Sequence, residues 1–239
     1  RISRENNMDT ILAYMFLMIK QARKKDVEIN RKAFEALGKD VELLPGVKTW
    51  FKRINEYGNS LGLDVEHYII SSGVKDIIEG CEIAPEFKKI YACEYMFDEH
   101  GDAVWPKVAI NYTMKTQYVF RISKGVDSLN DDAFVNSKVA EADRRVLYRN
   151  MIYFGDGETD IPCMKMIKEH GGHSIAVYGT EAKYATAKKL ISEERVNFVC
   201  AADYSKDKDM HKVVKRVLRK IKADYDFKRL LNIHKNKKE

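Results

Sequence analysis

Residues 151–160 have the sequence MIYFGDGETD, and this stretch decides the fold class. Its first four residues are apolar or aromatic, which is typical of a short buried strand. A glycine and a run of polar residues follow at once, with Asp156 and Asp160 four residues apart. Because ligands of open parallel sheets bind beyond the carboxyl ends of the strands, these two carboxylates are candidates for chemistry.

Two like charges held together at a strand end repel each other, and a hard divalent cation such as Mg²⁺ relieves that repulsion. The glycines on both sides of Asp156 let the backbone turn tightly and approach a ligand. One alternative is a capped helix start, in which Asp156 or Thr159 caps the helix and the negative charge of Asp160 interacts favourably with the helix dipole. A calcium loop is another, but the EF-hand spacing is absent. A cap needs one acid and no paired glycines, so the pattern favours a metal site at Asp156 and Asp160.

A second strand end carries polar residues. Val65 to Ile70 is a short apolar run that predicts a buried strand, and Ser71-Ser72-Gly73 after it predicts a loop before a helix at Lys75 to Glu79. A hydroxyl and backbone N–H groups beside a glycine form a cradle for an anion. The alternative is an ordinary turn with a helix N-cap.

Outward from these two stretches, helical and strand patterns alternate. In the first part of the chain we expect a helix with its N-cap at Asp9, a second helix that stops at Gly38 and a third that closes near Gly58. A hairpin of 89–97 and 103–111, a helix near Lys115 and a polar surface excursion over 123–148 should follow. The last part should contain a helix over 161–169, strands at 174–178 and 198–200, and a terminal helix. This alternation predicts an α/β fold with a parallel sheet covered by helices on both faces.

The same residues carry a resemblance to a known family. Ile70-Ser71-Ser72-Gly73 and the segment Gly155 to Asp160 resemble the second and fourth signature motifs of the haloacid dehalogenase (HAD) superfamily. Lys115, after Asn111-Tyr112-Thr113, is similar to the lysine of the third motif. The turn Leu44 to Val47 and its helix are similar to the segment before motif two in the phosphoserine-phosphatase-like branch.

The resemblance covers roughly residues 40–215 and implies a Rossmann-like, HAD-like core at 41–239. It also implies a small helical cap at 1–40 and a β-hairpin excursion from the core. As chemistry it implies phosphoryl transfer through an aspartyl-phosphate with Mg²⁺ as cofactor. Its catalytic residues would be Ser71, Lys115 and Asp160, its phosphate ligands Ser71, Ser72, Gly73 and Lys115, and its metal ligands Asp156 and Asp160. Lys115 has an alternative interpretation as an exposed residue of a first helical turn.

The sequence departs from the family at its first motif, an apolar strand that ends in Asp-x-Asp and supplies the nucleophile. Residues 207–209 and 224–226 have that spacing, but they lie in charged, helix-like surroundings, so we reject both. We expect the nucleophile-bearing strand to precede Arg1 in the natural protein, which leaves the 239 residues themselves inactive.

The function predicted from the sequence is a Mg²⁺-dependent phosphatase that acts on a small phosphorylated metabolite. Two alternatives stay open: an inactive HAD-like module that binds phosphate, and a dehalogenase-type hydrolase of the same superfamily.

Composition supports a globular protein with a sizeable core, since 45% of the residues are hydrophobic and 33% are charged. No apolar run reaches the roughly 18 residues of a membrane helix, and no secretory signal is evident. The scattered cysteines Cys81, Cys93, Cys163 and Cys200 lack metal-site or disulfide spacing. We therefore expect a cytoplasmic protein with reduced thiols and no membrane partner.

The net charge of +6 is concentrated near the end of the sequence. Residues 212–239 hold 11 Lys and Arg against 3 Asp and Glu, whereas the other 211 residues hold 31 against 33. A basic segment can bind nucleic acid or an acidic membrane surface. Because no aromatic residues interleave in the manner of RNA-binding proteins, we expect a solvated terminal helix without a nucleic-acid partner.

Overall fold

A computed structural model describes residues 2–128 and 130–236 of the chain, which forms two compact units. Unit 1 comprises residues 1–42 and 66–118, and unit 2 comprises residues 43–65 and 119–239. The helical segment predicted as a cap over residues 1–40 thus belongs to the same unit as residues 66–118, and its role as a cap stays a prediction. Arg1 of that segment and residues 237–239 of the basic segment lie outside the described residues.

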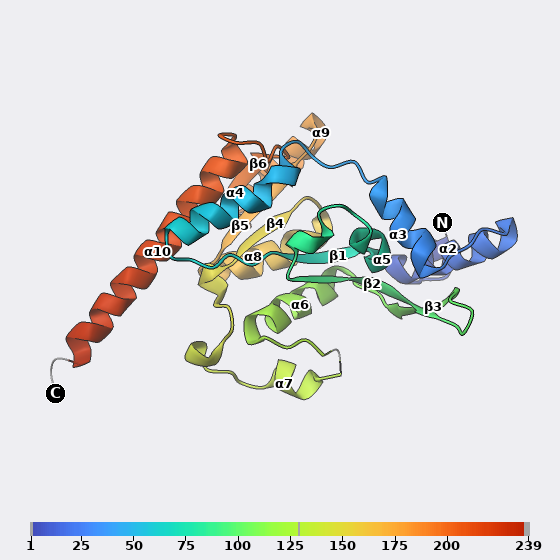
Figure 1. The fold of residues 1–239 in the computed structure, drawn as a ribbon, viewed down its shortest axis with the longest axis horizontal. Coiled ribbons are helices and arrows are strands. Elements are labelled where there is room, and N and C mark those ends of the chain that lie inside the picture. Colours follow the sequence, from blue (N-terminus) through green and yellow to red (C-terminus); the bar gives the residue numbers. More distant parts are fainter. Residues whose placement is uncertain (1, 129, 237–239) are drawn as a thin grey trace. The chain divides into compact units, whose positions relative to one another are not determined.

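Unit 1 contains a mixed three-stranded sheet with several helices (Figure 1). Its strand order is β1-β2-β3, with β1 and β2 parallel and β2 and β3 antiparallel. The antiparallel pair confirms the predicted hairpin. The elements are α1 (Ile2–Glu5), α2 (Thr10–Lys25), α3 (Arg31–Lys39), β1 (Tyr68–Val74), α5 (Lys75–Glu79), η1 (Ala84–Glu86), β2 (Lys89–Phe97), β3 (Ala103–Val108) and the start of α6 (Tyr112–Lys124).

Helix α2 begins as the sequence predicts. The Asp9 carboxylate accepts hydrogen bonds from the backbone N–H groups of Ile11 and Leu12, at 2.9 and 3.0 Å. These bonds satisfy two of the amide groups that the first turn of a helix leaves without partners. Asp9 is therefore the N-cap.

The predicted end of the second helix at Gly38 is wrong, because α3 continues through Gly38 to Lys39. Gly38 serves close packing instead. A Cβ atom there would lie 2.1 Å from the carbonyl oxygen of Ile77 in α5, and one at Gly80 would lie 2.1 Å from the carbonyl oxygen of Glu35 in α3. The two glycines let the backbones of α3 and α5 approach each other, which a sequence pattern does not distinguish from a helix stop.

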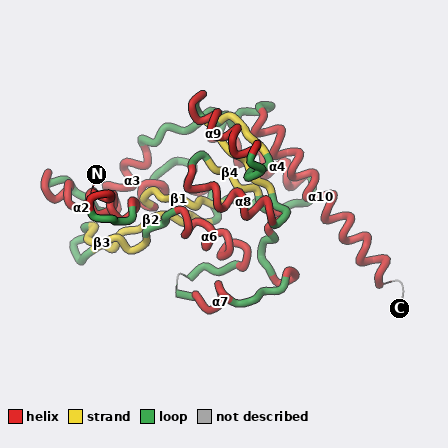
Figure 2. The backbone as a smooth tube through the Cα atoms, turned by 180° about the vertical axis from the view of Figure 1, so that it is seen from behind, coloured by secondary structure: helices red, strands yellow, loops and turns green. Residues whose placement is uncertain are grey.

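Unit 2 contains a parallel three-stranded sheet with the order β4-β5-β6, flanked by helices (Figures 1 and 2). The elements are α4 (Val47–Ser60), the end of α6, α7 (Asp132–Asn136), η2 (Glu141–Asp143), η3 (Tyr148–Asn150), β4 (Ile152–Gly155), η4 (Glu158–Asp160), α8 (Ile161–Glu169), β5 (His173–Tyr178), α9 (Glu181–Ser192), β6 (Phe198–Ala201) and α10 (Asp209–Asn236). Helix α4 runs past Gly58, so the predicted closure there is two residues early.

Helix α4 is held in unit 2 by aromatic packing and a tight turn. Trp50 packs edge-on against Phe154 of β4 and against Tyr204, with ring centroids 6.4 and 5.1 Å apart. Gly46 precedes the helix with φ at +79°, and a Cβ atom on it would lie 2.3 Å from the backbone nitrogen of Ser205. The predicted turn before this helix is confirmed.

The α/β class with parallel strands and flanking helices is confirmed. The strands form two three-stranded sheets, one in each unit, and β1 and β4 each lie at an edge of their sheet. Among the described residues, no helix is both long and apolar enough to cross a membrane. All four cysteines are buried free thiols.

Candidate functional site

The serine segment predicted as a loop lies within strand β1, which extends to Val74. The pairing register with β2 shifts between Ile70 and Val74, so the irregularity that the sequence suggested is a bulge in the strand. The hydroxyl of Ser71 accepts a hydrogen bond of 3.0 Å from the backbone N–H of Gly73. The contact of Ser71 with phosphate stays a prediction.

Ser72 is tied into the backbone around it. Its hydroxyl donates to the carbonyl of Ile110 at 2.7 Å, and its carbonyl accepts from the Tyr14 hydroxyl of α2 at 2.6 Å. These bonds join β1 to α2 and to the segment before α6. A contact of Ser72 with phosphate stays a prediction. The hydroxyl proton of Ser72 is already donated to Ile110, so such a contact would need another group of Ser72.

Lys115 lies in the first turns of α6 with only 6% of its surface exposed, so the alternative of an exposed lysine is wrong. The helix start is fixed by Asn111, whose side-chain oxygen accepts from the N–H of Met114 at 3.1 Å. The side-chain nitrogen of Asn111 donates to the Asp9 carboxylate at 3.2 Å, which connects the starts of α6 and α2.

Cys93 of β2 shows that Lys115 and the serine segment share one neighbourhood. Its sulfur lies 3.3 Å from the carbonyl oxygen of Ser72 and accepts from the N–H of Ile110 at 3.2 Å. Burial raises the pKa of the Cys93 thiol, while the positive charge of Lys115 is close enough to oppose that rise. Unit 1 thus brings Ser71, Ser72 and Lys115 to the same end of β1.

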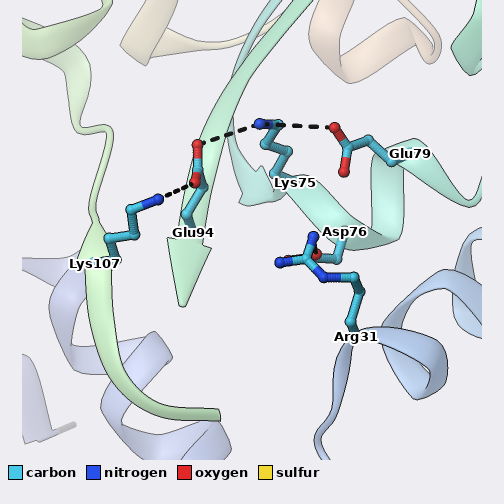
Figure 3. Close-up of polar contacts among 6 residues, drawn as sticks. All are labelled: Arg31, Lys75, Asp76, Glu79, Glu94 and Lys107. Carbon is cyan, nitrogen blue, oxygen red and sulfur yellow. Dashed lines mark hydrogen bonds and ion pairs between the residues drawn. The ribbon is translucent and has the colours of Figure 1, made fainter. Parts of the chain in front are cut away.

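Another lysine, Lys75, follows this segment directly and is already paired (Figure 3). Its ammonium lies 3.4 Å from Glu94 of β2 and 3.7 Å from Glu79 in its own helix. Glu94 also accepts from Lys107 at 3.0 Å. Although burial opposes it, hydrogen bonding from Lys107 and the charge of Lys75 leave the pKa of Glu94 below its ordinary value. Lys75 therefore neutralises acids beside the serine segment.

The neighbouring Asp76 is buried, with an exposed partner. Its carboxylate lies 2.6 Å from the guanidinium of Arg31 in α3, and only 4% of its side chain is exposed against 59% for Arg31 (Figure 3). Burial raises the pKa of Asp76 above its ordinary value, and Arg31 opposes the rise. The pair links α3 to the helix that follows the serine segment.

In unit 2, Asp156 directly follows β4 and its carboxylate is exposed. It lies 3.3 Å from the ammonium of Lys183 in the first turn of α9, and 70% of its side chain is accessible. Burial raises the pKa of Tyr204 to about 12, and the negative charge of Asp156 adds to the rise. Asp156 therefore lies at the carboxyl end of the sheet, close to the segment that follows β6.

Asp160 is buried, with 6% of its surface exposed. It accepts a hydrogen bond of 2.8 Å from the Tyr153 hydroxyl. Burial raises the pKa of Tyr153, and the charge of Asp160 contributes to the rise. Gly155 allows this arrangement, because a Cβ atom on it would lie 2.5 Å from the Cβ of Asp160.

The capping alternative for these acids is confirmed in part, because Asp160 lies at the N-terminus of α8, where a negative charge interacts favourably with the helix dipole. Asp160 is the N-cap residue of α8 but makes no side-chain cap hydrogen bond, and Asp156 is not a cap residue. The two carboxylates stand at one strand end, one exposed and one buried. That pair fits Mg²⁺, which is commonly held by one or two carboxylates together with water and phosphate oxygens. No group of three or more His, Cys, Asp or Glu side chains suited to a metal occurs among the described residues.

The predicted site residues fall into two sets. Ser71, Ser72, Gly73 and Lys115 belong to unit 1, and Asp156 and Asp160 belong to unit 2, so each set is described within its own unit. Sequence patterns missed Tyr14, Cys93 and Lys183, whose positions depend on tertiary contacts. Only Asn111, which precedes a helical pattern, had a local signal as a capping residue.

Both rejected Asp-x-Asp segments lie at or within α10. Asp209 is its first residue, and Asp224 and Asp226 are paired with Lys220 and Lys222, both at 2.5 Å. Neither segment directly follows a described strand, so their rejection as the nucleophile motif is confirmed.

No protein-family model matches the chain. A curated but uncharacterized protein of Borreliella burgdorferi is 29% identical over 198 residues, which cover 74% of this chain and 67% of that protein. The crystal structure of a HAD family hydrolase from Salmonella enterica serovar Typhi is 16% identical, with a TM-score of 0.45. That match covers 83% of this chain, which spans 60% of the length of the Salmonella chain.

Proposed function

We propose that the chain supplies the phosphate-binding and metal-binding parts of a Mg²⁺-dependent phosphatase of the HAD type. Its substrate would be a small phosphorylated metabolite, cleaved through an aspartyl-phosphate. The observation that carries the proposal is the burial of Lys115 at the serine-bearing end of β1. An ammonium held beside a serine hydroxyl suits the negative charge of a phosphate group.

Each residue has a role that its surroundings support. Ser71 would donate its O–H to a phosphoryl oxygen, since its oxygen already accepts from Gly73. Lys115 would offset the negative charge of the phosphate and of the attacking carboxylate. Phosphoryl transfer depends mainly on positioning and charge neutralisation, and these two residues provide both.

Asp156 and Asp160 would form the metal part of the site. Asp156 is exposed, and its ion pair with Lys183 is accessible to solvent, which suits direct coordination of a metal. Asp160 is buried and accepts a hydrogen bond from Tyr153, so it would support the metal site from the protein interior. The bound Mg²⁺ would neutralise charge on the transferring phosphoryl group.

None of the six described strands is followed directly by Asp-x-Asp. The proposal therefore assigns the nucleophile to a part of the natural protein outside these residues, on a strand beside β1 or β4. Both are edge strands of their sheets, and the backbone groups of an edge strand can pair with a further strand.

The test is hydrolysis of a generic aryl phosphate by the full natural protein, with and without Mg²⁺. We expect Mg²⁺-dependent turnover, and we expect Asp156→Asn to lower kcat/KM by roughly 100- to 1000-fold. Glu158→Gln is the matched control, because Glu158 is an exposed carboxylate of the same turn. Phosphate binding without turnover would overturn the enzymatic claim in favour of a binding module, and equal loss in both variants would overturn the metal role of Asp156.

A further inference from the structure

Helix α10 has two apolar faces, and its first half packs into unit 2. Its buried residues recur three and four positions apart, as expected of a helix that covers a core. They are Met210, Val214, Val217, Leu218 and Ile221. Helix α10 contacts β6 and α4 of the same unit.

The second half of α10 carries apolar side chains that are exposed. Phe227 is 63% exposed, Leu230 is 51% exposed and Leu231 is 46% exposed, and Ile233 is similar. At about 100° per residue, this second stripe is centred about 160° around the helix from the buried stripe. The exposed face thus points away from the side that packs on unit 2. Figures 1 and 2 both show this half extending past β4, β5 and β6.

Basic residues accompany the exposed face. Residues 222–236 hold 4 Lys and Arg against 2 Asp. Asp224 and Asp226 are already paired, with Lys220 and Lys222 at 2.5 Å. Lys228 lies 3.0 Å from Glu141, whereas Arg229 and Lys235 have no carboxylate within salt-bridge distance in the described chain. The segment therefore presents an apolar stripe with excess positive charge around it.

We propose that residues 222–236 of α10 form an interfacial helix that binds an anionic lipid surface. An apolar face flanked by Lys and Arg is the pattern of helices that lie in the plane of a membrane surface. A second copy of the chain would bring like charges together, and nucleic acid would leave the apolar stripe in water. The sequence alone predicted no membrane partner. The exposed apolar stripe of α10 can be recognised only once the structure shows which side of the helix is buried in unit 2.

The test is flotation of the full natural protein with two kinds of vesicle. One contains phosphatidylcholine alone, and the other also contains about 30% phosphatidylserine, which gives a strongly negative surface. We expect binding only to the anionic vesicles, and weaker binding at higher salt. Arg229→Gln with Lys235→Gln should weaken binding roughly 25-fold, since each basic residue near such a surface contributes about fivefold.

The apolar stripe is tested by Phe227→Ser, Leu230→Ser and Leu231→Ser combined. We expect this variant to lose at least about tenfold in binding while its melting temperature changes little, because all three side chains are exposed. Asn232→Ser, on the opposite side of the same helix, is the matched control. Unchanged vesicle binding in the triple variant would overturn the proposal. The proposal would also be overturned if the triple variant kept vesicle binding but lost a concentration-dependent dimer or a complex with duplex DNA.

Discussion

The ends of β1 and β4 carry the two sets of candidate residues, and they are built differently. At β1, Ser72 is bonded to Ile110 and Tyr14, and Lys115 is buried. At β4, Asp156 is exposed and forms an ion pair with Lys183, whose side chain is also exposed. The β1 end is thus arranged by the fold before any ligand arrives, whereas the β4 end keeps one carboxylate available to solvent and to a cation.

Substitutions at the β1 end should affect stability as well as binding, whereas substitution of Asp156 should affect mainly binding. Residues at the β1 end serve both the fold and the proposed site, so their effects have to be separated by matched variants. Asp156 contributes little to the fold, because exposed ion pairs such as the one with Lys183 stabilise proteins weakly.

The largest expected effect is on activity. Lys115→Met in the full natural protein should lower kcat/KM by roughly 100- to 1000-fold, because it removes the charge at the phosphate. Its stability should change little, since a methionine of similar length fills the same buried space. Kinetics with an aryl phosphate and a thermal melt measure the two effects. Lys107→Met, which removes an exposed lysine of unit 1, is the control, and an equal loss of activity there would contradict the assignment.

The close crossing of α3 and α5 should be the most sensitive part of the framework behind the β1 end. Gly80→Ala places a Cβ atom 2.1 Å from the carbonyl oxygen of Glu35, so the helices must move apart. We expect a loss of about 2–3 kcal/mol in the free energy of unfolding, measured with urea. Gly179→Ala, where no atom lies within 4 Å, should cost far less. Equal costs would show that the crossing is not tight.

The two serines should separate structure from binding. Ser72→Ala leaves the carbonyl of Ile110 without its hydroxyl donor and should cost about 1–2 kcal/mol of unfolding free energy. Compared with Ser72→Ala, Ser71→Ala should lower the unfolding free energy less and weaken the binding of inorganic phosphate more. Urea unfolding and calorimetric titration measure the two quantities. The reverse pattern would assign the phosphate contact to Ser72.

The smallest effect is a dependence of stability on pH through Asp76. Burial raises the pKa of Asp76, so the folded protein holds the proton more tightly than the unfolded chain. Stability therefore falls as the pH rises from the ordinary value of 3.8 through the raised pKa. Arg31→Met should raise that pKa further and lower stability at pH 7 by less than about 1 kcal/mol, because Arg31 is exposed. Urea titrations at pH 7 and pH 5 test this, and a difference that grows at the lower pH would contradict it.

Local patterns predicted most of the fold. The N-cap at Asp9, the hairpin of β2 and β3, and the acids after β4 follow from residue types and their spacing. Tertiary packing explains the errors. Gly38 is needed for a helix crossing, and the serine segment continues β1 because it remains next to β2.

The candidate site could be predicted only in part, for the same reason. Residue types identified Ser71, Asp156 and Asp160 as candidates, but no pattern showed that Lys115 is buried or that Tyr14 reaches Ser72. Contacts across more than fifty residues leave no periodic signal in a sequence.

The most direct test of the central claim uses Mn²⁺ in place of Mg²⁺ with inorganic phosphate bound to the full natural protein. If the natural protein transfers phosphoryl groups with Mg²⁺, Mn²⁺ in its place should strongly enhance the relaxation of the bound ³¹P nucleus. Both Asp156→Asn and Lys115→Met should abolish that enhancement. Enhancement that survives Lys115→Met unchanged, or phosphate that binds with no effect of Mn²⁺, would contradict the account.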